Sequence, residues 1–307
     1  MRKISALIVV AGLLASLTAC STASAPGSAG CTTPASGNAS SVVTATGKFG
    51  SAPKVKLPSP IVTSHTEVST LIQGHGQILT DGTPALIKLA LYSGTTGKLL
   101  QSSYKTPSAP LTVGSTSTTT AKALTDALRC STVGSRLAIA IRESDASATT
   151  GDTGDKSEPA YVAVVDVVKA FLPKANGSLR FGVNNMPAVV TAANGAPGIS
   201  LPNVDAPKTE KVQVVREGAG RKITAKDTVV LQFTQIDWAP SPTVVQSTWT
   251  KGGAAEAVEI SKVSDPVKKA LVGQTVGSQV MAVIPGTDQT TGAPTTYVFV
   301  FDLLGTL

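Results

Sequence analysis

The chain has 307 residues, with 26 Lys and Arg against 19 Asp and Glu, and a formal net charge of +7. The basic residues are spread along the chain without runs. Because nucleic-acid binding needs basic residues clustered on one face or strip, this pattern argues against a nucleic-acid partner. There is no Cys-x-x-Cys, and the two histidines, His65 and His75, stand beside turn-like residues, so no metal site is expected.

The first twenty residues have the pattern of an export signal. Arg2-Lys3 precedes an apolar run over residues 4–17, which is shorter than the ~20 residues of a membrane-spanning helix but suits a secretory signal. The run ends in Leu17-Thr18-Ala19-Cys20, which resembles the lipobox of bacterial lipoproteins. That resemblance implies a signal peptide over residues 1–19 and a lipid on Cys20, which would anchor the exported protein to the outside of the cell membrane. The alternative is an ordinary secretory signal followed by an unrelated cysteine.

Removal of residues 1–19 lowers the net charge from +7 to +5, which is 24 basic minus 19 acidic residues. This mild excess fits a plain soluble surface, and the alternative is loose attraction to anionic lipid or wall polymer. If Cys20 carries lipid, Cys31 and Cys130 are the remaining thiols. Exported proteins meet oxidising conditions, so we predict a disulfide between Cys31 and Cys130. The alternative is two free thiols that lie too far apart to meet.

Residues 20–47 are predicted to be a flexible tether. After Cys20 this stretch has no charged residue and consists mostly of Ser, Thr, Ala, Gly and Pro. Such a composition buries too little apolar surface to offset the entropy lost on ordering.

The rest of the chain contains an internal duplication. Gly74-His75-Gly76 is answered by Gly218-Ala219-Gly220, and Val133-Gly134-Ser135 by Val276-Gly277-Ser278, at offsets of 144 and 143 residues. Two copies indicate a duplicated domain, because a solenoid needs shorter periods and more units. We therefore predict one domain over residues 48–172, a linker over 173–207 that is rich in Gly, Asn and Pro, and a second domain over 208–307.

Each copy is predicted to be rich in β-strands. Apolar or alternating runs bounded by turn residues indicate strands at 85–92, 111–113, 136–141 and 161–168, and at 228–236, 257–260, 279–284 and 297–304. One short helix fits each copy. Asp265-Pro266 is typical of a helix start, with Asp265 as the N-cap, and Leu124, Ala127 and Leu128 form an apolar face in the first copy. The predicted fold class is α+β, with a twisted antiparallel sheet wrapped around one short helix in each domain.

The second copy resembles the FKBP-type peptidyl-prolyl cis-trans isomerases in the order of its sequence signals. The matching segments are VQVVREGAG (212–220), DTVVLQF (227–233), QSTW (246–249), KALVGQTVGS (269–278) and TYVFVFDLL (296–304). No single segment is specific, but the set, in this order, extends over most of the second domain, from residue 212 to residue 304. The resemblance implies two tandem FKBP-like domains, of which the first is the more divergent.

By this resemblance, a proline pocket in the second domain would be lined by Phe233, Val245, Gln246, Val258, Val263, Val267 and Phe299. The backbone near Ser264 would donate a hydrogen bond to the substrate. Several positions depart from the family: Phe233 replaces a tyrosine, Val245-Gln246 replaces Phe-Asp, and Val267 replaces a tryptophan that would bury up to ~250 Å². These changes predict a shallow pocket and catalysis that is weak or absent. Trp238 or Trp249 could refill the pocket, and the alternative is ordinary packing of both.

The first domain departs further from the family. Leu100-Gln101 replaces Phe-Asp, Leu124 replaces the tryptophan, and Ala163 stands at the position that corresponds to Phe299 of the second copy. We therefore expect it to be structural or to bind ligands without catalysis.

The chemistry implied by the resemblance is rotation about an X-Pro bond, whose barrier is ~18–20 kcal/mol. An apolar pocket takes water from the prolyl amide and favours the twisted transition state, and it needs no cofactor or metal. We predict a weak, lipid-anchored isomerase that assists the folding of exported proteins, with proline-containing segments of those proteins as its partners. The alternatives are a non-catalytic peptide-binding or chaperone lipoprotein on the same fold, and a purely structural spacer. The sequence does not predict an oligomeric state.

Overall fold

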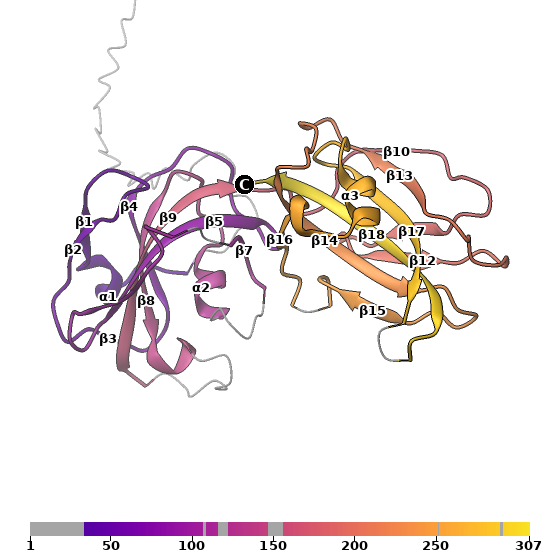
Figure 1. Ribbon diagram of the computed structural model, residues 1–307. Coiled ribbons are helices and arrows are strands. Elements are labelled where there is room, and N and C mark those ends of the chain that lie inside the picture. The colour runs from indigo at the N-terminus through magenta and orange to yellow at the C-terminus, as the bar shows by residue number, and fades with distance from the viewer. Residues whose placement is uncertain (1–33, 107–108, 116–121, 147–155, 251, 289–290) are drawn as a thin grey trace, which may run out of the picture. The chain divides into compact units, whose positions relative to one another are not determined.

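The computed structural model describes residues 34–106, 109–115, 122–146, 156–250, 252–288 and 291–307 (Figure 1). The chain divides into two compact units, Met1–Gly30 and Cys31–Leu307, and every described residue belongs to the second unit. The predicted signal peptide, Cys20 and Cys31 therefore lie outside the described residues. Within the described ranges, no helix has the length and apolar character needed to cross a membrane.

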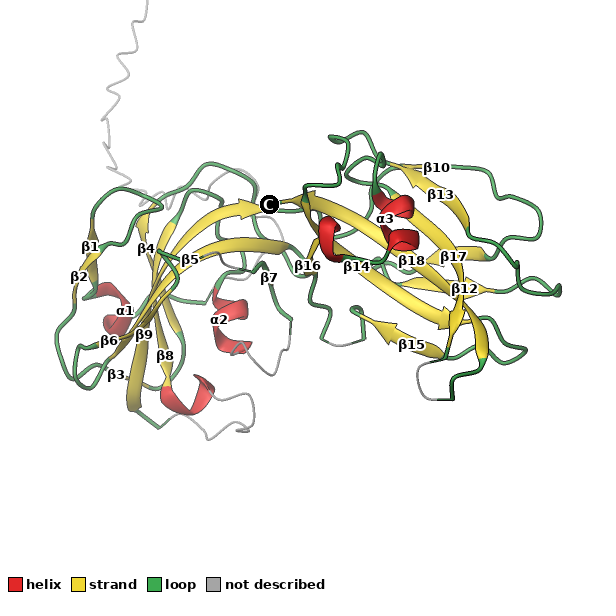
Figure 2. Ribbon diagram, in the orientation of Figure 1, coloured by secondary structure: helices red, strands yellow, loops and turns green. Residues whose placement is uncertain are grey.

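The first half of the unit is built on a seven-stranded antiparallel sheet (Figure 2). Its strands run in the order β4-β8-β9-β5-β6, while β3 pairs with β9 and β7 pairs with β5. The bounds are β3 (Val62–Thr63), β4 (Glu67–Ile72), β5 (Pro84–Ser93), β6 (Leu99–Ser102), β7 (Leu111–Thr112), β8 (Arg136–Arg142) and β9 (Glu158–Ala170).

The second half carries another seven-stranded antiparallel sheet with the corresponding strand order, β13-β17-β18-β14-β15. Strand β16 pairs with β14 as β7 pairs with β5, and a short strand, β10, adds to the edge at β13. The bounds are β10 (Ser178–Leu179), β13 (Lys211–Glu217), β14 (Thr228–Asp237), β15 (Val244–Ser247), β16 (Glu256–Glu259), β17 (Gln279–Thr287) and β18 (Pro294–Thr306).

The two sheets also share their irregularities. Register shifts occur at Thr70/Ile72, Leu86/Ile87 and Leu91/Tyr92 in the first sheet, and at Val214/Arg216, Val230/Leu231 and Gln235/Ile236 in the second. Each pair of shifts is separated by 144 residues, the offset seen between the glycine motifs. Bulges bend and twist a strand, so the two halves curve in the same way. All eight predicted strands overlap observed ones, and the observed β9, β17 and β18 extend up to three residues beyond the predicted bounds.

Three described helices pack against these sheets, namely α1 (Asn38–Ser41) on the first sheet and one further helix in each half. Helix α2 (Lys122–Ala127) packs on the first sheet and α3 (Asp265–Leu271) on the second. Ser264, not Asp265 as predicted, is the N-cap of α3, which places Pro266 in the first turn. We call the side of each sheet that carries α2 or α3 the helix face, and the other side the outer face. Two 3₁₀ turns, η1 (Glu143–Ala146) and η2 (Ile260–Lys262), complete the helical elements of the described residues.

The outer face of the first sheet is covered by residues that the composition assigned to a flexible tether, so that prediction is wrong for this stretch. Helix α1 (Asn38–Ser41) and the hairpin β1 (Thr44–Thr46) and β2 (Lys54–Lys56) lie there. Ala39 and Val43 are buried against Ala138, Ala140 and Val164. The Ser40 amide donates a 3.0 Å hydrogen bond to Glu67 Oε2. Small side chains suffice here because the sheet supplies the apolar partner surface.

A buried ion pair fixes the loop after β1. The Arg136 and Asp166 side chains are fully buried, with Nε and Oδ1 2.6 Å apart. Arg136 Nη1 also donates to the Gly47 carbonyl at 3.0 Å, and the Gly50 amide donates to Asp166 Oδ2 at 2.7 Å. The backbone of this loop therefore satisfies the remaining hydrogen-bonding groups of the pair.

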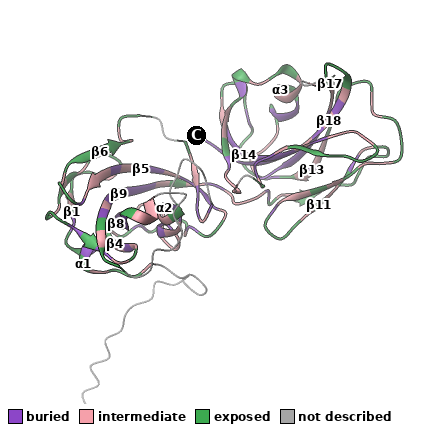
Figure 3. Cartoon of the chain, turned by 90° about the horizontal axis from the view of Figure 1, so that it is seen from below, coloured by how far each residue is buried: buried purple, intermediate pink, exposed green. Residues whose placement is uncertain are grey.

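The predicted linker, 173–207, is likewise structured and covers the outer face of the second sheet, so the expectation of a plain linker is corrected. The hairpin β11 (Ala188–Thr191) and β12 (Pro197–Ser200) lies within it. Val189 and Ile199 pack against Val283, Val298 and Val300. As a result β9 and β18 are buried along most of their length (Figure 3).

The repeated glycines occupy sites of close backbone approach. A Cβ on Gly74 would lie 2.4 Å from the Val133 carbonyl oxygen, and one on Gly218 would lie 2.3 Å from that of Val276. The Gly74 amide donates to Ser135 Oγ at 3.0 Å, and the Gly218 amide to Ser278 Oγ at 2.9 Å. The motif repeats because the same chain crossing is built twice.

Candidate functional site

Phenylalanine side chains gather on the helix face of the second sheet. Phe233 lies directly opposite Phe301 across β14 and β18, with ring centroids 6.0 Å apart. Phe299 stacks on Phe301 with centroids 5.5 Å apart and planes 3° apart. Phe233 and Phe301 are buried, whereas Phe299 is partly exposed and open to a ligand.

Three of the other residues predicted for the site join this group. Val258 on β16 and Val267 on α3 pack, partly buried, against the same core. Gln246 on β15 pairs with Gln235 on β14, and Gln235 lies opposite Phe299 on β18. These three residues therefore form one row across three neighbouring strands. These contacts bring together side chains that are up to 68 residues apart in the sequence, from Phe233 to Phe301.

Three predicted residues are not brought into the group by any recorded contact. Val245 stands at the bulge between β14 and β15 and is 51% exposed. Val263 and Ser264 connect η2 to α3, where Val263 is half-buried and Ser264 exposed. The first amides of a helix have no intrahelical acceptor, and the donor role of the backbone near Ser264 stays a prediction.

Tyr297 and Ile284 also lie beside the Phe299 group, although the sequence did not predict them as site residues. Tyr297 is two residues before Phe299 on β18, points to the same face, and meets Phe299 edge-on with centroids 6.4 Å apart. The alternation Tyr297, Phe299, Phe301 is a period-two signal that identifies this face. Neither tryptophan refills the site: Trp238 packs on the outer face, and the Trp249 ring lies against Gly195.

The first half holds an apolar cavity of about 570 Å³ on its helix face. Its lining includes Leu89, Leu91, Leu124, Ile141, Tyr161 and Ala163. These positions match the predicted site of the second half through the shared register. Leu89 lies opposite Val165 as Phe233 lies opposite Phe301, and Leu91 lies opposite Ala163 as Gln235 lies opposite Phe299. A cavity of this size falls within the range of ligand pockets, ~300–1,000 Å³.

Hydroxyl groups at the cavity are bonded within the protein. Thr125 Oγ1 donates to the Ser115 carbonyl at 3.0 Å, and Ser115 Oγ donates to the Thr112 carbonyl at 2.7 Å. Ser103 Oγ accepts the Leu89 amide at 2.9 Å. Tyr161 Oη donates to Glu143 Oε1 at 3.2 Å, and burial together with this bond raises the pKa of Tyr161. The lining therefore favours an apolar ligand, because these hydroxyl groups already have hydrogen-bond partners within the protein.

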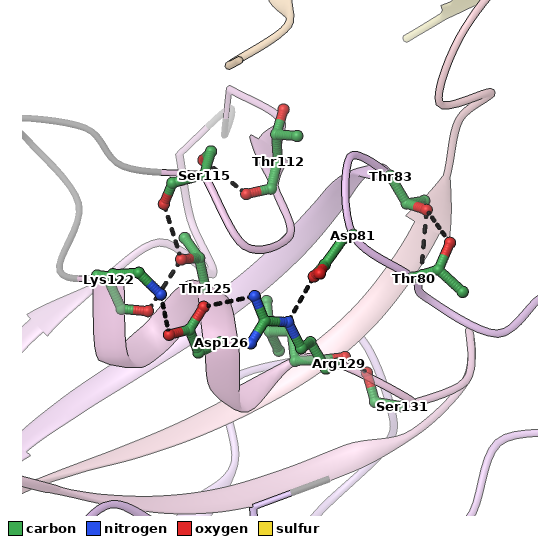
Figure 4. Close-up of polar contacts among 11 residues, drawn as sticks. Thr80, Asp81, Thr83, Thr112, Ser115, Lys122, Thr125, Asp126, Arg129 and Ser131 are labelled. Atoms are coloured by element: carbon green, nitrogen blue, oxygen red, sulfur yellow. Dashed lines mark hydrogen bonds and ion pairs between the residues drawn. The ribbon is translucent and has the colours of Figure 1, made fainter. Parts of the chain in front are cut away.

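A chain of ion pairs holds α2 beside the cavity (Figure 4). Lys122 pairs with Asp126, Arg129 Nη2 lies 3.2 Å from Asp126 Oδ1, and Arg129 Nε pairs with Asp81. These groups are partly exposed, so each pair contributes about 0–1 kcal/mol. Their main effect is to fix the end of α2 against the turn before β5.

Cys130 is disulfide-bonded and has a left-handed backbone conformation, with φ of 64°. Its partner lies outside the described residues, so the pairing with Cys31 stays a prediction. Among the described residues no cluster of potential metal ligands occurs.

No family model and no curated protein matches this chain. Similar solved structures include FkpA from Escherichia coli, with 22% identity over 38% of this chain, and the three FKBP domains of wheat FKBP73, with 12% over 79%. The N-terminal domain of FKBP42 from Arabidopsis thaliana is 14% identical over 36% of this chain. These matches cover 51%, 94% and 99% of those chains, with TM-scores of 0.28, 0.27 and 0.29. The chain thus spans about half of the E. coli protein, and TM-scores this low do not establish a common fold.

Proposed function

We propose that this chain is an exported, lipid-anchored protein with two FKBP-like domains that assists the folding of secreted proteins by acting on their proline-containing segments. Its second half is a weak peptidyl-prolyl isomerase. The observation that carries this proposal is the convergence of Phe233, Val258, Val267 and Phe299 beside α3. A prolyl ring placed on Phe299 leaves water, and the backbone N–H near Ser264 donates a hydrogen bond to the carbonyl oxygen that precedes the proline.

Catalysis by this surface needs neither nucleophile nor metal. The planar ground state of the prolyl amide has charge-separated resonance that water stabilises, and the twisted transition state has less of it. Removing water therefore lowers the barrier. With Val267 in place of a large aromatic wall, less of the ring is enclosed, and we expect a small acceleration. Uncatalysed isomerisation takes tens of seconds or longer, so a small acceleration is useful to an emerging chain.

A prolyl-tetrapeptide isomerisation assay tests the activity, with the chain from residue 21 onward. Phe299→Ala should remove most of the acceleration because it deletes the exposed ring of the site. Phe181→Ala is the matched control, since Phe181 is 99% exposed and makes no recorded contact with the Phe299 group. No acceleration by the native chain at micromolar concentration would refute the isomerase.

A second function is favoured by one specific observation, the aliphatic cavity of the first half. Such a surface suits a binding or chaperone module that holds extended apolar segments without catalysis. Suppressed aggregation of an unfolded client, in the absence of isomerisation, would select this function.

A further inference from the structure

The two halves differ in what fills the space beside the helix. In the second half, three phenyl rings occupy the helix face, contributed by Phe233, Phe299 and Phe301. In the first half the same register positions carry Leu89, Ala163 and Val165. The missing rings account for the cavity of about 570 Å³ beside α2. The rings of the second half thus indicate what kind of group would fill the cavity of the first half, namely an aromatic ring.

One member of the aromatic group is kept in both halves. Tyr297 stands edge-on to Phe299, with centroids 6.4 Å apart and planes at 64°. Its counterpart Tyr161 lines the cavity, two residues before Ala163. Edge-to-face contacts between aromatic rings at such separations are favourable beyond the burial of the ring surfaces. Tyr161 therefore presents to the cavity a surface whose partner ring the first half does not itself supply.

We propose that the cavity of the first half binds an aromatic side chain of a client polypeptide, whether or not a proline is next to it. The ring takes the place that Phe299 holds in the second half, meets Tyr161 edge-on, and is enclosed by Leu89, Leu124 and Ile141. This inference rests on the proposed function only in taking the ligand to be a segment of an unfolded chain. An engineered cavity of ~150 Å³ already binds benzene, so the cavity has room for the ring and part of the adjoining chain.

Titration of a short proline-free Gly/Ser peptide carrying one Phe, against its twin with Ala, tests the inference on the chain from residue 21 onward. Methyl NMR shifts report the binding. The Phe peptide should bind at least about tenfold more tightly, a difference of ~1.4 kcal/mol, because its ring leaves water in the cavity whereas the Ala methyl group buries little surface. Equal binding of the two peptides would overturn the inference.

Ala163→Phe should fill the cavity from within and weaken binding of the Phe peptide about tenfold or more. Ala163→Leu is a second filling variant should the first fail to fold, and Tyr161→Leu should weaken binding several-fold while the cavity remains. Phe181→Ala is the matched control: Phe181 is 99% exposed and does not line the cavity, so the change should not weaken binding.

The outcomes separate this inference from the proposed function. If the native chain accelerates prolyl isomerisation but Ala163→Phe leaves the Phe peptide bound as before, the aromatic site is refuted and the isomerase stands. If the Phe peptide binds and Ala163→Phe releases it while no isomerisation is found, the aromatic site stands without the isomerase.

Discussion

Each half carries one acid near the end of its last long strand that is shut away from solvent, and the two acids are compensated differently. Asp166 has a charged partner, Arg136, whereas Asp302 accepts hydrogen bonds from Gln279 Nε2 at 2.8 Å and from the Ala175 amide at 2.9 Å. Burial raises the pKa of Asp302 although both bonds oppose the rise. The neutral amide of Gln279 thus stabilises the charged form of Asp302 less than a charged partner would.

Replacing Arg136 by Gln, the residue at the corresponding position of the second half, should strongly destabilise the first half. The change leaves Asp166 as an unpaired buried charge, which costs ~3–5 kcal/mol. Denaturant unfolding followed by far-UV circular dichroism measures the loss. Arg180→Gln serves as the control, because its pair with Glu217 is about half exposed and should contribute about 0–1 kcal/mol. Equal losses in the two variants would contradict this account.

Asp302→Asn should stabilise the second half at neutral pH. Below about pH 4 the carboxyl is protonated in both the folded and the unfolded chain and costs nothing. As pH rises above that value, the unfolded carboxyl ionises first because its pKa is the lower one, so native stability falls. The variant lacks this loss, and the Gln279 amide can turn to accept from the new Nδ2. The free energy of unfolding at about pH 4 and pH 7 should therefore differ less for Asp302→Asn, and an unchanged pH dependence would refute the prediction.

At the scale of the elements, the duplicated chain crossing depends on two Gly-x-Gly segments that pass over the loop before β8 and β17. Gly74 and Gly218 touch backbone atoms, which cannot move aside as a flexible side chain can. This contact explains why the glycines recur while their neighbours differ.

Gly74→Ala should destabilise the first half by ~1–3 kcal/mol, the usual cost of overpacking. The same change at Gly182 is the control, since a Cβ there would meet nothing within 4 Å and its φ is not in the left-handed region. Thermal unfolding of the two variants checks the difference. A loss at Gly182 as large as that at Gly74 would count against the close-approach argument.

The strands and both sheet-facing helices could be predicted because alternation and the proline at the start of α3 are local signals. The outer-face segments could not be, because Ala39, Val43, Val189 and Ile199 lie in very short apolar stretches among Ser, Thr, Gly, Asn and Pro. Their burial depends on a sheet formed by distant residues. For the candidate site, the residues that converge beside α3 follow from the family resemblance. The cavity of the first half does not follow from the resemblance, because it arises where Leu89 and Ala163 carry smaller side chains than Phe233 and Phe299.

At the scale of the whole molecule, we propose that this chain lies outside the cell and is held by lipid on Cys20, while Cys130 is disulfide-bonded. The packed region begins by residue 35, whose carbonyl accepts the Val68 amide at 3.1 Å. Only about fifteen residues then separate a lipid on Cys20 from the first sheet, an extended reach of at most ~50 Å. Clients would thus be handled close to the membrane surface.

Cys20→Ala should abolish anchoring, because a multiply acylated cysteine is the only lipid signal that we propose, and lipid chains contribute ~0.8 kcal/mol for each buried methylene. Membrane fractionation of cells that make the variant should find nearly all the protein unprocessed or soluble. Cys130→Ala is the control and should remain in the membrane fraction. Unchanged processing and anchoring of Cys20→Ala would refute the lipoprotein assignment.

The central claim is that apolar segments of client chains bind on the helix faces, beside α2 and α3. NMR titration of the chain from residue 21 onward with a prolyl tetrapeptide tests this most directly. The account predicts that shifts concentrate at Val258, Val267 and Phe299, and at Leu124 and Ala163. Shifts confined to the outer faces, around Val164 and Val300, or no shifts at millimolar peptide, would contradict it.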